Sequence, residues 1–496
     1  MSPGNAEMAG HVTFGFTVSG LPPDTFFVQD FTGEEALNGD FVFRVTLLSR
    51  NASLNPQALL GRDASFFIES RREGDLVKVP THGMIGELGI YRQVFDRVEY
   101  RATLVPRLSR LDHSSYSEIY TLEKSIPELL EEVLKESGFT SQDYQFKVVD
   151  GGRPRSFVCQ YRESPRHFID RWAEREGLVY YFDHSGEREK VIFYDQPHQK
   201  PSWTKSLTYR PPGDLDAGFA DDSLTELFET ARPVPGKTVV SDFNYRKANL
   251  DIREEEVLDP RIETLVEEHG DNLRTNAEAK RQVKIRGEAL RCRARIFTGT
   301  STATEIRAGT TITVRNYFRD GLSGSLFVTR ARYEGRMREI GSMTAGVGAG
   351  EGGIFTTSFE AIPFDVPFRP ECKTPWPQIP GVVQGIVEGE GSGKFAELNE
   401  YGEYKIRFPF ALTKKKAQKG SGWVRLSTPL AGAEHGIHFP LHKDTEVLVS
   451  FMGGDPDQPV IVGALHNSET RNLVTNKNPA TNIIHTFGGT VVMIND

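Results

Sequence analysis

The chain has 496 residues, of which 38% are hydrophobic and 26% are charged, and its formal net charge is −9. This composition is typical of a soluble globular protein rather than of a disordered or membrane protein, and the length predicts two to four domains. The acidic balance argues against a surface built mainly for nucleic acid, which usually needs a basic face.

Cysteine usage and the N-terminus give hints about the compartment. The three cysteines, Cys159, Cys292 and Cys372, lie far apart without a C-x-x-C pair, so neither a disulfide framework nor a cysteine zinc site is indicated. The start, MSPGNAEMAGHVTFGF, lacks the basic residues and apolar run of a Sec signal peptide. No apolar stretch approaches the ~20 residues of a membrane-spanning helix. We therefore expect a reducing compartment, and any export to follow a route without a Sec signal.

Strand patterns dominate the first part of the chain. In the segment DFVFRVTLLS, the residues Phe41, Phe43, Val45 and Leu47 alternate with more polar neighbours, and residues 98–104 repeat the pattern. Both segments predict half-buried strands of an antiparallel sheet.

Three helices are predicted between the strands. The segment SIPELLEEVLKESGF has Ser125 as a cap in an S-x-x-E box and Gly138 as a left-handed stop. In ESPRHFIDRWAEREGLVYYF, Ser164 caps a second helix, proline occupies its first turn, and Gly177 ends it before a strand. A third helix is predicted for residues 274–292.

Glycine and proline mark the domain organisation. Residues 341–353, GSMTAGVGAGEGG, predict a flexible loop. Residues 362–380 contain six prolines and predict a stiff, extended connector at a domain boundary. We therefore expect a first region over residues 1–361, a second domain over 381–466 and a final segment over 467–496.

The second domain contains five short apolar segments between turn-rich loops. Their number and spacing favour a five-stranded Greek-key barrel of the oligomer-binding (OB) type, with a small sandwich as the alternative. The final segment is polar and then resumes strand-like alternation. Overall the fold class is mainly β with α+β parts. The five segments are GVVQGIVEG, YKIRFPF, GWVRLSTP, TEVLVSF and PVIVGALH.

The segment FMGGDPDQPV contains a D-x-D pair that in some enzymes holds a divalent cation. The same residues favour a turn between two strands, because glycine admits positive φ, proline fixes φ, and aspartates bond to nearby N–H groups. We interpret the stretch as a structural turn and expect neither a metal nor a catalytic role. The turn residues are Gly454, Asp455, Pro456, Asp457 and Pro459.

Three histidines are weak candidates for a metal site. His435, His438 and His442 lie close enough in sequence to converge on zinc. Pro440 prevents a helix, however, and in an extended segment His438 and His442 share a face while His435 points to the other. Loop and sheet histidines without a metal are the favoured interpretation, and no cofactor is expected.

Other short motifs that could indicate a binding or catalytic site lack the sequence context that such a site needs. Gly348, Gly350 and Gly353 match G-x-G-x-x-G, but a strand rather than a helix follows. The lysine run 414–416 with Lys419 lacks the aromatic residues that single-stranded nucleic acid would need, so we interpret it as a solvated loop. No G-x-S-x-G or H-E-x-x-H motif occurs. We therefore expect no enzymatic activity, although a cell-wall hydrolase using an acidic pair remains an alternative.

Several segments resemble the VgrG family, the tip proteins of the bacterial type VI secretion system, which is similar to the hub and spike of contractile phage tails. The resemblance covers the chain from about Asn38 to the end. It rests on LNPQALLGRDASFFIES, HGMIGELGIYRQVFDRVEYRATLVPRLSRL, SFVCQYRESPRHFIDRWAEREGLVYYFDH, HFPLHKDTEVLVSFMGGDPDQPVIVGALHN and IIHTFGGTVVMIND.

This resemblance implies a hub of two barrel-like domains over residues 1–361, an OB-fold neck and the start of a trimeric β-helical or β-prism stem. It implies a homotrimer that caps a hexameric Hcp-like tube, contacts baseplate components and nucleates tube assembly. A tip-sharpening PAAR-like protein and effectors would bind through a needle, whose repeats are expected to be absent or truncated after Asp496.

The resemblance also implies assembly in the bacterial cytoplasm, export without a Sec signal, transient membrane penetration and no nucleic-acid partner. A phage or prophage tail hub and spike is the alternative that the sequence separates least well.

Overall fold

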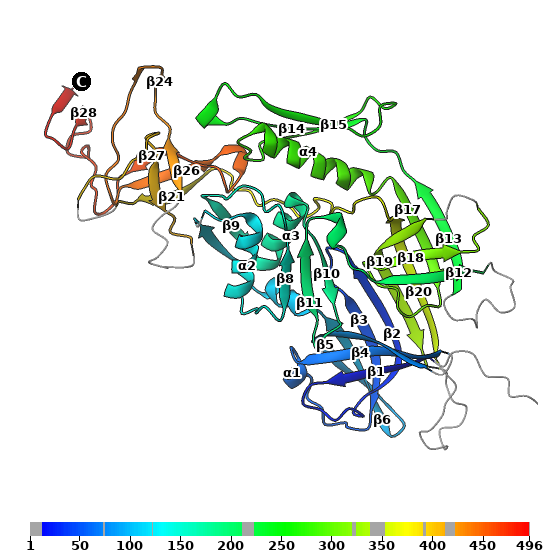
Figure 1. Cartoon of the computed structure of the whole chain (residues 1–496). Helices are drawn as coiled ribbons and strands as arrows, with labels where there is room; N and C mark the ends of the chain where they lie inside the picture. Colours follow the sequence, from blue (N-terminus) through cyan, green and yellow to red (C-terminus); the bar gives the residue numbers. More distant parts are fainter. Residues whose placement is uncertain are drawn as a thin grey trace, which may run out of the picture. The chain divides into compact units, whose positions relative to one another are not determined.

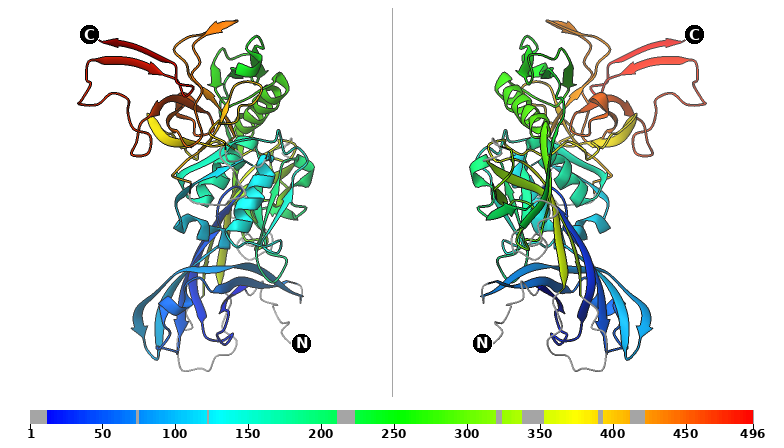
Figure 2. Two further views of the ribbon diagram at one scale, coloured as in Figure 1. Left: turned by 90° about the vertical axis from the view of Figure 1, so that its left-hand side faces the viewer. Right: turned by 90° about the vertical axis from the view of Figure 1, so that its right-hand side faces the viewer.

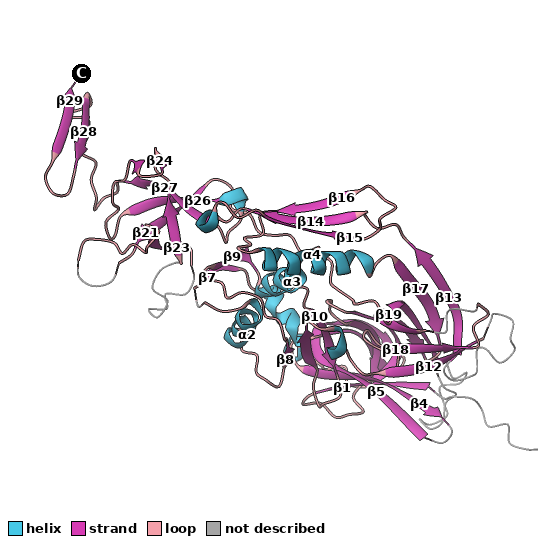
Figure 3. Cartoon of the chain, turned by 45° about the horizontal axis from the view of Figure 1, so that its top comes forward, coloured by secondary structure: helices cyan, strands magenta, loops and turns pink. Residues whose placement is uncertain are grey.

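The structure is a computed structural model (Figure 1), in which strands predominate over helices (Figure 3). This confirms the predicted mainly β fold. The structure describes residues 12–72, 75–121, 123–210, 223–319, 324–337, 353–389, 393–411 and 422–495.

The chain forms two compact units, and each is built from separate stretches of sequence. The chain passes between them after Ser114, Ser125, Arg153, Glu163 and Pro375. Two short stretches from within the first 361 residues therefore group with the C-terminal part. Unit 1 comprises Met1–Ser114, Ile126–Arg153 and Ser164–Pro375, and unit 2 comprises Ser115–Ser125, Pro154–Glu163 and Trp376–Asp496.

Unit 1 is organised around a twelve-stranded sheet. The last six strands form a closed ring, because β20 pairs with both β17 and β19. The resemblance implied barrel-like hub domains, and this ring is one. The sheet order is β1 (Val12–Val18), β4 (Asp63–Arg72), β5 (Asp75–Val94), β6 (Arg97–Val105), β3 (Val42–Ser49), β2 (Phe27–Ala36), β19 (Ser325–Arg336), β18 (Thr311–Arg315), β12 (Thr204–Tyr209), β13 (Ser223–Ala231), β17 (Arg295–Ser301) and β20 (Ile354–Pro363).

The first six strands of this sheet curl around an aromatic core. The ring of Phe14 on β1 lies 4.9 Å from that of Phe31 on β2, and Phe31 lies 4.4 Å from Phe66 on β4. The two end strands of this half thus meet through their side chains. The alternation predicted for this segment is confirmed, since Phe41, which directly precedes β3, and Phe43, Val45 and Leu47 on β3 are all buried.

The predicted helices are present in unit 1 as α2 (Ile126–Glu136), α3 (Pro165–Glu176) and α4 (Asn276–Arg291), with a further short α1 (Pro56–Leu59). The Ser164 hydroxyl accepts a hydrogen bond from the His167 N–H at 3.0 Å, which confirms the predicted cap. Gly177 ends α3 with φ at 68°, as its position predicts.

Two small sheets accompany these helices. One consists of β10 (Val179–Asp183), β11 (Lys190–Tyr194) and β8 (Tyr144–Lys147). The other consists of β15 (Ile252–Val257), β14 (Lys237–Asp242) and β16 (Leu265–His269). Helix α4 lies along β14 and β15, as Figures 1 and 2 show.

Unit 2 contains a closed five-stranded barrel, which confirms the predicted OB-type topology and excludes the sandwich. Its core also takes Ile119 from β7 (Tyr116–Tyr120), Cys159 from β9 (Val158–Glu163) and Phe157, which directly precedes β9, all in the inserted stretches. The barrel order is β21 (Val382–Val387), β22 (Tyr404–Arg407), β23 (Trp423–Leu426), β27 (Pro459–Leu465) and β26 (Glu446–Phe451).

Two hairpins extend from the barrel of unit 2. The first pairs β24 (Ala431–Gly432) with β25 (His435–Gly436), and the second pairs β28 (Thr481–His485) with β29 (Val491–Asn495). We call the second the end hairpin. Among the described residues, no helix is long and apolar enough to cross a membrane.

The glycine at the end of α3 provides a test of local packing. A Cβ atom at Gly177 would lie 2.7 Å from Cγ2 of Ile285, whereas a Cβ at Gly138, which also has positive φ, would have no heavy atom within 4 Å. We expect Gly138→Ala to destabilise unit 1 by about 1 kcal/mol through backbone strain, and Gly177→Ala by about 2–4 kcal/mol because steric overlap is added. Denaturant unfolding followed by circular dichroism measures both. Equal losses would contradict the packing described here.

Candidate functional site

The predicted turn joins two barrel strands of unit 2. Strand β26 ends at Phe451 and β27 begins at Pro459. Between them Gly453 and Gly454 adopt φ values of 61° and 80°, which side-chain-bearing residues rarely adopt. The glycines thus supply the backbone conformation that the sequence pattern demands.

The Asp455 carboxylate organises this turn and holds the end of the proline-rich connector. Oδ1 accepts hydrogen bonds from the Asp457 N–H at 3.0 Å and from the Trp376 indole N–H at 3.1 Å. Oδ2 accepts one from the Gln458 side-chain amide at 2.9 Å. A further backbone bond joins the Ile379 N–H to the Gly454 carbonyl at 2.9 Å.

The Asp457 carboxylate faces a different part of unit 2. It is 6% exposed, and its Oδ1 accepts a hydrogen bond from the backbone N–H of Cys159 at 2.6 Å. Cys159 lies on β9, in an inserted stretch almost 300 residues earlier in the chain. Because Asp455 and Asp457 bind different N–H donors, their arrangement supports the interpretation as a structural turn.

The three candidate histidines have separate neighbours. His435 is exposed, with Nδ1 2.8 Å from the Ala433 carbonyl oxygen. His438 has Nε2 3.5 Å from the Tyr404 hydroxyl, and the His442 ring packs against Phe395 and Phe487. Within the described ranges, no three His, Cys, Asp or Glu residues group as metal ligands do. The lysines 414–416 and Lys419, and the glycines Gly348 and Gly350, lie outside the described residues.

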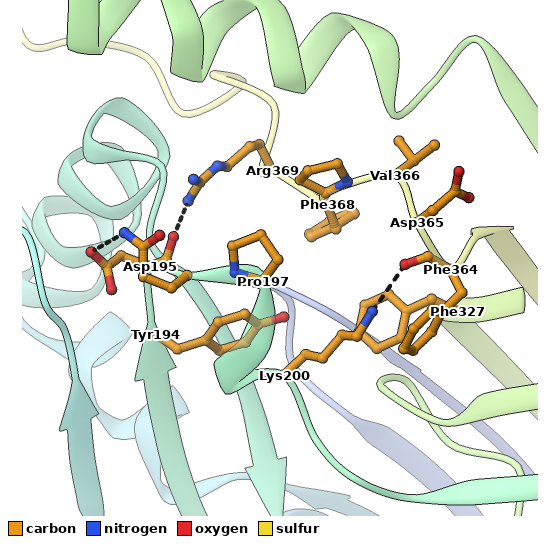
Figure 4. Close-up of a pocket in the computed structure, with 12 residues that line it drawn as sticks. Tyr194, Asp195, Pro197, Lys200, Phe327, Phe364, Asp365, Val366, Phe368 and Arg369 are labelled. Carbon is orange, nitrogen blue, oxygen red and sulfur yellow. Dashed lines mark hydrogen bonds between the residues drawn. The ribbon is translucent and has the colours of Figure 1, made fainter.

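A small pocket in unit 1 lies beside the proline-rich connector (Figure 4). Its volume of about 30 Å³ suits a water molecule or two, and is far below the ~300 Å³ of the smallest ligand sites. Lys200 donates a hydrogen bond to the Phe364 carbonyl at 3.0 Å. The pocket is thus a small gap where the connector packs against unit 1, rather than a substrate site.

Arg369 anchors the connector to unit 1, which the sequence did not predict. Its guanidinium donates to the backbone carbonyls of Gly177 and Asp195, each at 2.7 Å, and to the Glu288 carboxylate at 2.7 Å. The only available signal was an arginine among prolines, and such a residue has no partner that can be named from sequence.

The end hairpin exposes apolar side chains on both faces. Ile483 lies opposite Met493, and Ile484 lies opposite Val492, so consecutive apolar residues point to opposite faces. Val492, Met493 and Ile494 are 52%, 54% and 62% exposed. An isolated two-stranded hairpin is marginally stable in water, and exposed apolar faces of this kind mark a candidate interaction surface.

We expect the Asp457 contact to stabilise the barrel of unit 2. Asp457→Ala leaves the buried Cys159 N–H without its acceptor and should cost about 1–3 kcal/mol, whereas Asp457→Asn keeps an acceptor oxygen and should cost less. Hydrogen exchange of residues 446–451 measures the loss, with Glu469→Ala, at an exposed position of the same unit, as the control.

A chelator separates this role from metal binding. The turn interpretation predicts that EDTA leaves exchange in residues 446–451 unchanged. If EDTA lowered protection as much as Asp457→Ala does, the D-x-D pair would be a cation site.

Two family models match the chain. Residues 34–338 match the phage tail baseplate hub (GPD) family, and residues 398–466 match the type VI secretion system/phage-baseplate injector OB domain. The first match alone covers more than half of the sequence, and the second falls on the barrel of unit 2.

The chain belongs to the phage tail baseplate hub family. It is 26% identical over 92% of its length to the type VI secretion system spike protein VgrG3 of Vibrio cholerae, covering 45% of that protein. It is 27% identical over 90% of its length to the spike protein VgrG1a of Pseudomonas aeruginosa, covering 69%. These matches confirm the resemblance of this chain to the VgrG proteins. The chain spans less than half the length of the first relative.

Solved structures support the same fold. An E. coli protein, c3393, described as a component of the type VI secretion system with structural similarity to the T4 phage tail proteins gp27 and gp5, superposes with a TM-score of 0.63. It is 20% identical, and the match covers 91% of this chain and 99% of that one. The lidded Francisella PdpA-VgrG complex also gives a TM-score of 0.63, at 11% identity, and the match covers 99% of this chain and 76% of that one.

Proposed function

We propose that this protein forms the homotrimeric tip of a type VI secretion system. It caps the secreted tube, helps to nucleate its assembly and carries effectors across target membranes when the sheath contracts. The observation that carries this proposal is the end hairpin, whose two apolar faces are exposed and would be covered by other copies of the chain in a trimer. The family match supplies the context of an injection machine.

The architecture of unit 1 supports a threefold assembly on a sixfold tube. The unit contains one closed six-stranded ring and a second six-stranded half that curls around an aromatic core. Three copies would therefore present six barrel-like parts to a hexameric Hcp-like tube protein. Closed point-group symmetry is the rule for such homo-oligomers.

The remaining partners follow from the same proposal. Baseplate components would contact the hub, and a PAAR-like tip protein and effectors would bind beyond the end hairpin. The protein would assemble in the bacterial cytoplasm and leave without a Sec signal. We propose no enzymatic role, which is supported by the engagement of Asp455 and Asp457 with protein N–H groups rather than with an open cleft.

The alternative is a phage or prophage tail hub and spike, which the same family match supports equally well. Deleting the gene in its own bacterium separates the two. The secretion proposal predicts that the tube protein disappears from the culture medium and returns on complementation with the full chain. Unchanged tube release, with the chain recovered in phage particles, would favour the alternative.

Substitutions in the end hairpin test whether it assembles the trimer. We expect Val492→Asp/Met493→Asp, which places one charge on each face, to reduce the native mass at micromolar concentration to that of a single chain, because burying unpaired carboxylates is costly. Native mass spectrometry measures the change.

A matched control adds the same charge to exposed positions of unit 2. Ser468→Asp/Asn472→Asp should keep the mass of the unmodified protein. If the hairpin variant also kept that mass, the end hairpin would not be the assembly element.

A further inference from the structure

Two histidines lie next to each other inside unit 1. His82 lies on β5, and His184 directly follows β10. The backbone N–H of His82 donates a hydrogen bond to Nδ1 of His184 at 3.0 Å. The His184 residue is only 3% exposed, so this bond joins the large sheet to the small β10–β11–β8 sheet away from water.

The hydrogen bond fixes the protonation state of His184. Because Nδ1 accepts a hydrogen bond, the ring of the neutral side chain carries its proton on Nε2. Nε2 is buried and has no hydrogen-bond partner among the described residues. A second proton could enter only at Nδ1, where it would face the His82 N–H and break the bond.

The surroundings of the pair disfavour positive charge. The Phe41 ring packs edge-on against His184 at 5.1 Å, and the two imidazole rings lie 6.2 Å apart. The Arg307 guanidinium lies next to β5, where it donates to the Pro80 carbonyl and, at 3.0 Å, to the Thr81 hydroxyl.

These neighbours explain the direction of each pKa. Burial, then the charge of Arg307 and then His82 lower the pKa of His184 well below its ordinary value. Burial and Arg307, with a smaller effect of Arg107, lower the pKa of His82, although a hydrogen bond with the Gly186 backbone opposes this. The two charged side chains outside the pair that lower these pKa values are both arginines, Arg307 and Arg107.

The Ser65 hydroxyl lies 2.8 Å from Nδ1 of His82 and connects the pair to β4 as well.

We propose that His82 and His184 form an acid-labile joint, at which protonation separates β5 from the end of β10 and locally opens the hub fold of unit 1. The proposal does not depend on the secretion role.

The sign of the pH dependence follows from the lowered pKa values. A histidine whose pKa is lower in the folded state stabilises the fold fully above its unfolded value of about 6.5, and this stabilisation is lost as the pH falls towards the folded value. Each proton taken up on opening raises the opening equilibrium tenfold per pH unit. Two histidines therefore predict up to a hundredfold rise per unit below pH 6.5.

Hydrogen exchange of the full chain between pH 7.5 and 5 tests the joint, after correction for the intrinsic pH dependence of exchange. We expect the opening equilibrium of residues 80–84 and 180–184 to rise 10- to 100-fold per unit below pH 6.5. The amide oxygen of His184→Gln can accept the hydrogen bond from the His82 N–H but does not titrate. In this variant at least one proton fewer should be taken up on opening, so the rise in the opening equilibrium per pH unit should be at least tenfold smaller. His198→Gln, at an exposed histidine of unit 1, should leave it unchanged.

If His184→Gln does not fold, His82→Asn provides the second test. The bond to His184 uses the backbone N–H of residue 82, so this variant keeps the bond. One proton fewer should be taken up on opening, so the opening equilibrium should rise tenfold less per pH unit. An unchanged slope in the folded variant, or a flat profile in the unmodified chain, would overturn the proposal. A parallel rise in residues 446–451 of the barrel would also overturn it, since general acid unfolding would then explain the result.

Discussion

The barrel of unit 2 depends on the hydrogen bond between the Cys159 N–H and the Asp457 carboxylate. This bond joins a stretch inserted from the first third of the chain to a turn near its end. The insert also gives Ile119, Phe157 and Cys159 to the barrel core. Since a buried N–H needs an acceptor, the turn and the insert stabilise each other through this bond.

The same construction explains why the proline-rich connector is not a loose tether. Its first part is fixed in unit 1 by Arg369, and its last part is fixed in unit 2 by the Trp376 indole and Asp455. The pocket beside the connector has room for only a water molecule or two, so the connector packs against unit 1 without framing a ligand site.

Much of the fold could be predicted from local sequence because local rules govern it. The five barrel strands, the Ser164 cap and the Gly177 stop depend on alternation, capping and positive φ within a few residues. The packing of the β7–β9 pair against the barrel could not be predicted, since it depends on contacts between residues almost 300 positions apart. The glycine, proline and aspartate residues predicted the turn. They did not predict which N–H groups the two aspartates bind. Arg369 and the His82–His184 pair were missed for the same reason: their partners are distant in sequence.

The central claim is that three copies of this chain assemble through surfaces that a single copy leaves apolar and exposed. Electron microscopy of the purified full-length protein tests it most directly, because it gives the symmetry as well as the number of chains. The account predicts a particle with a threefold axis and six barrel-like lobes around its hub end. A particle of one chain, or one with only twofold symmetry, would contradict it.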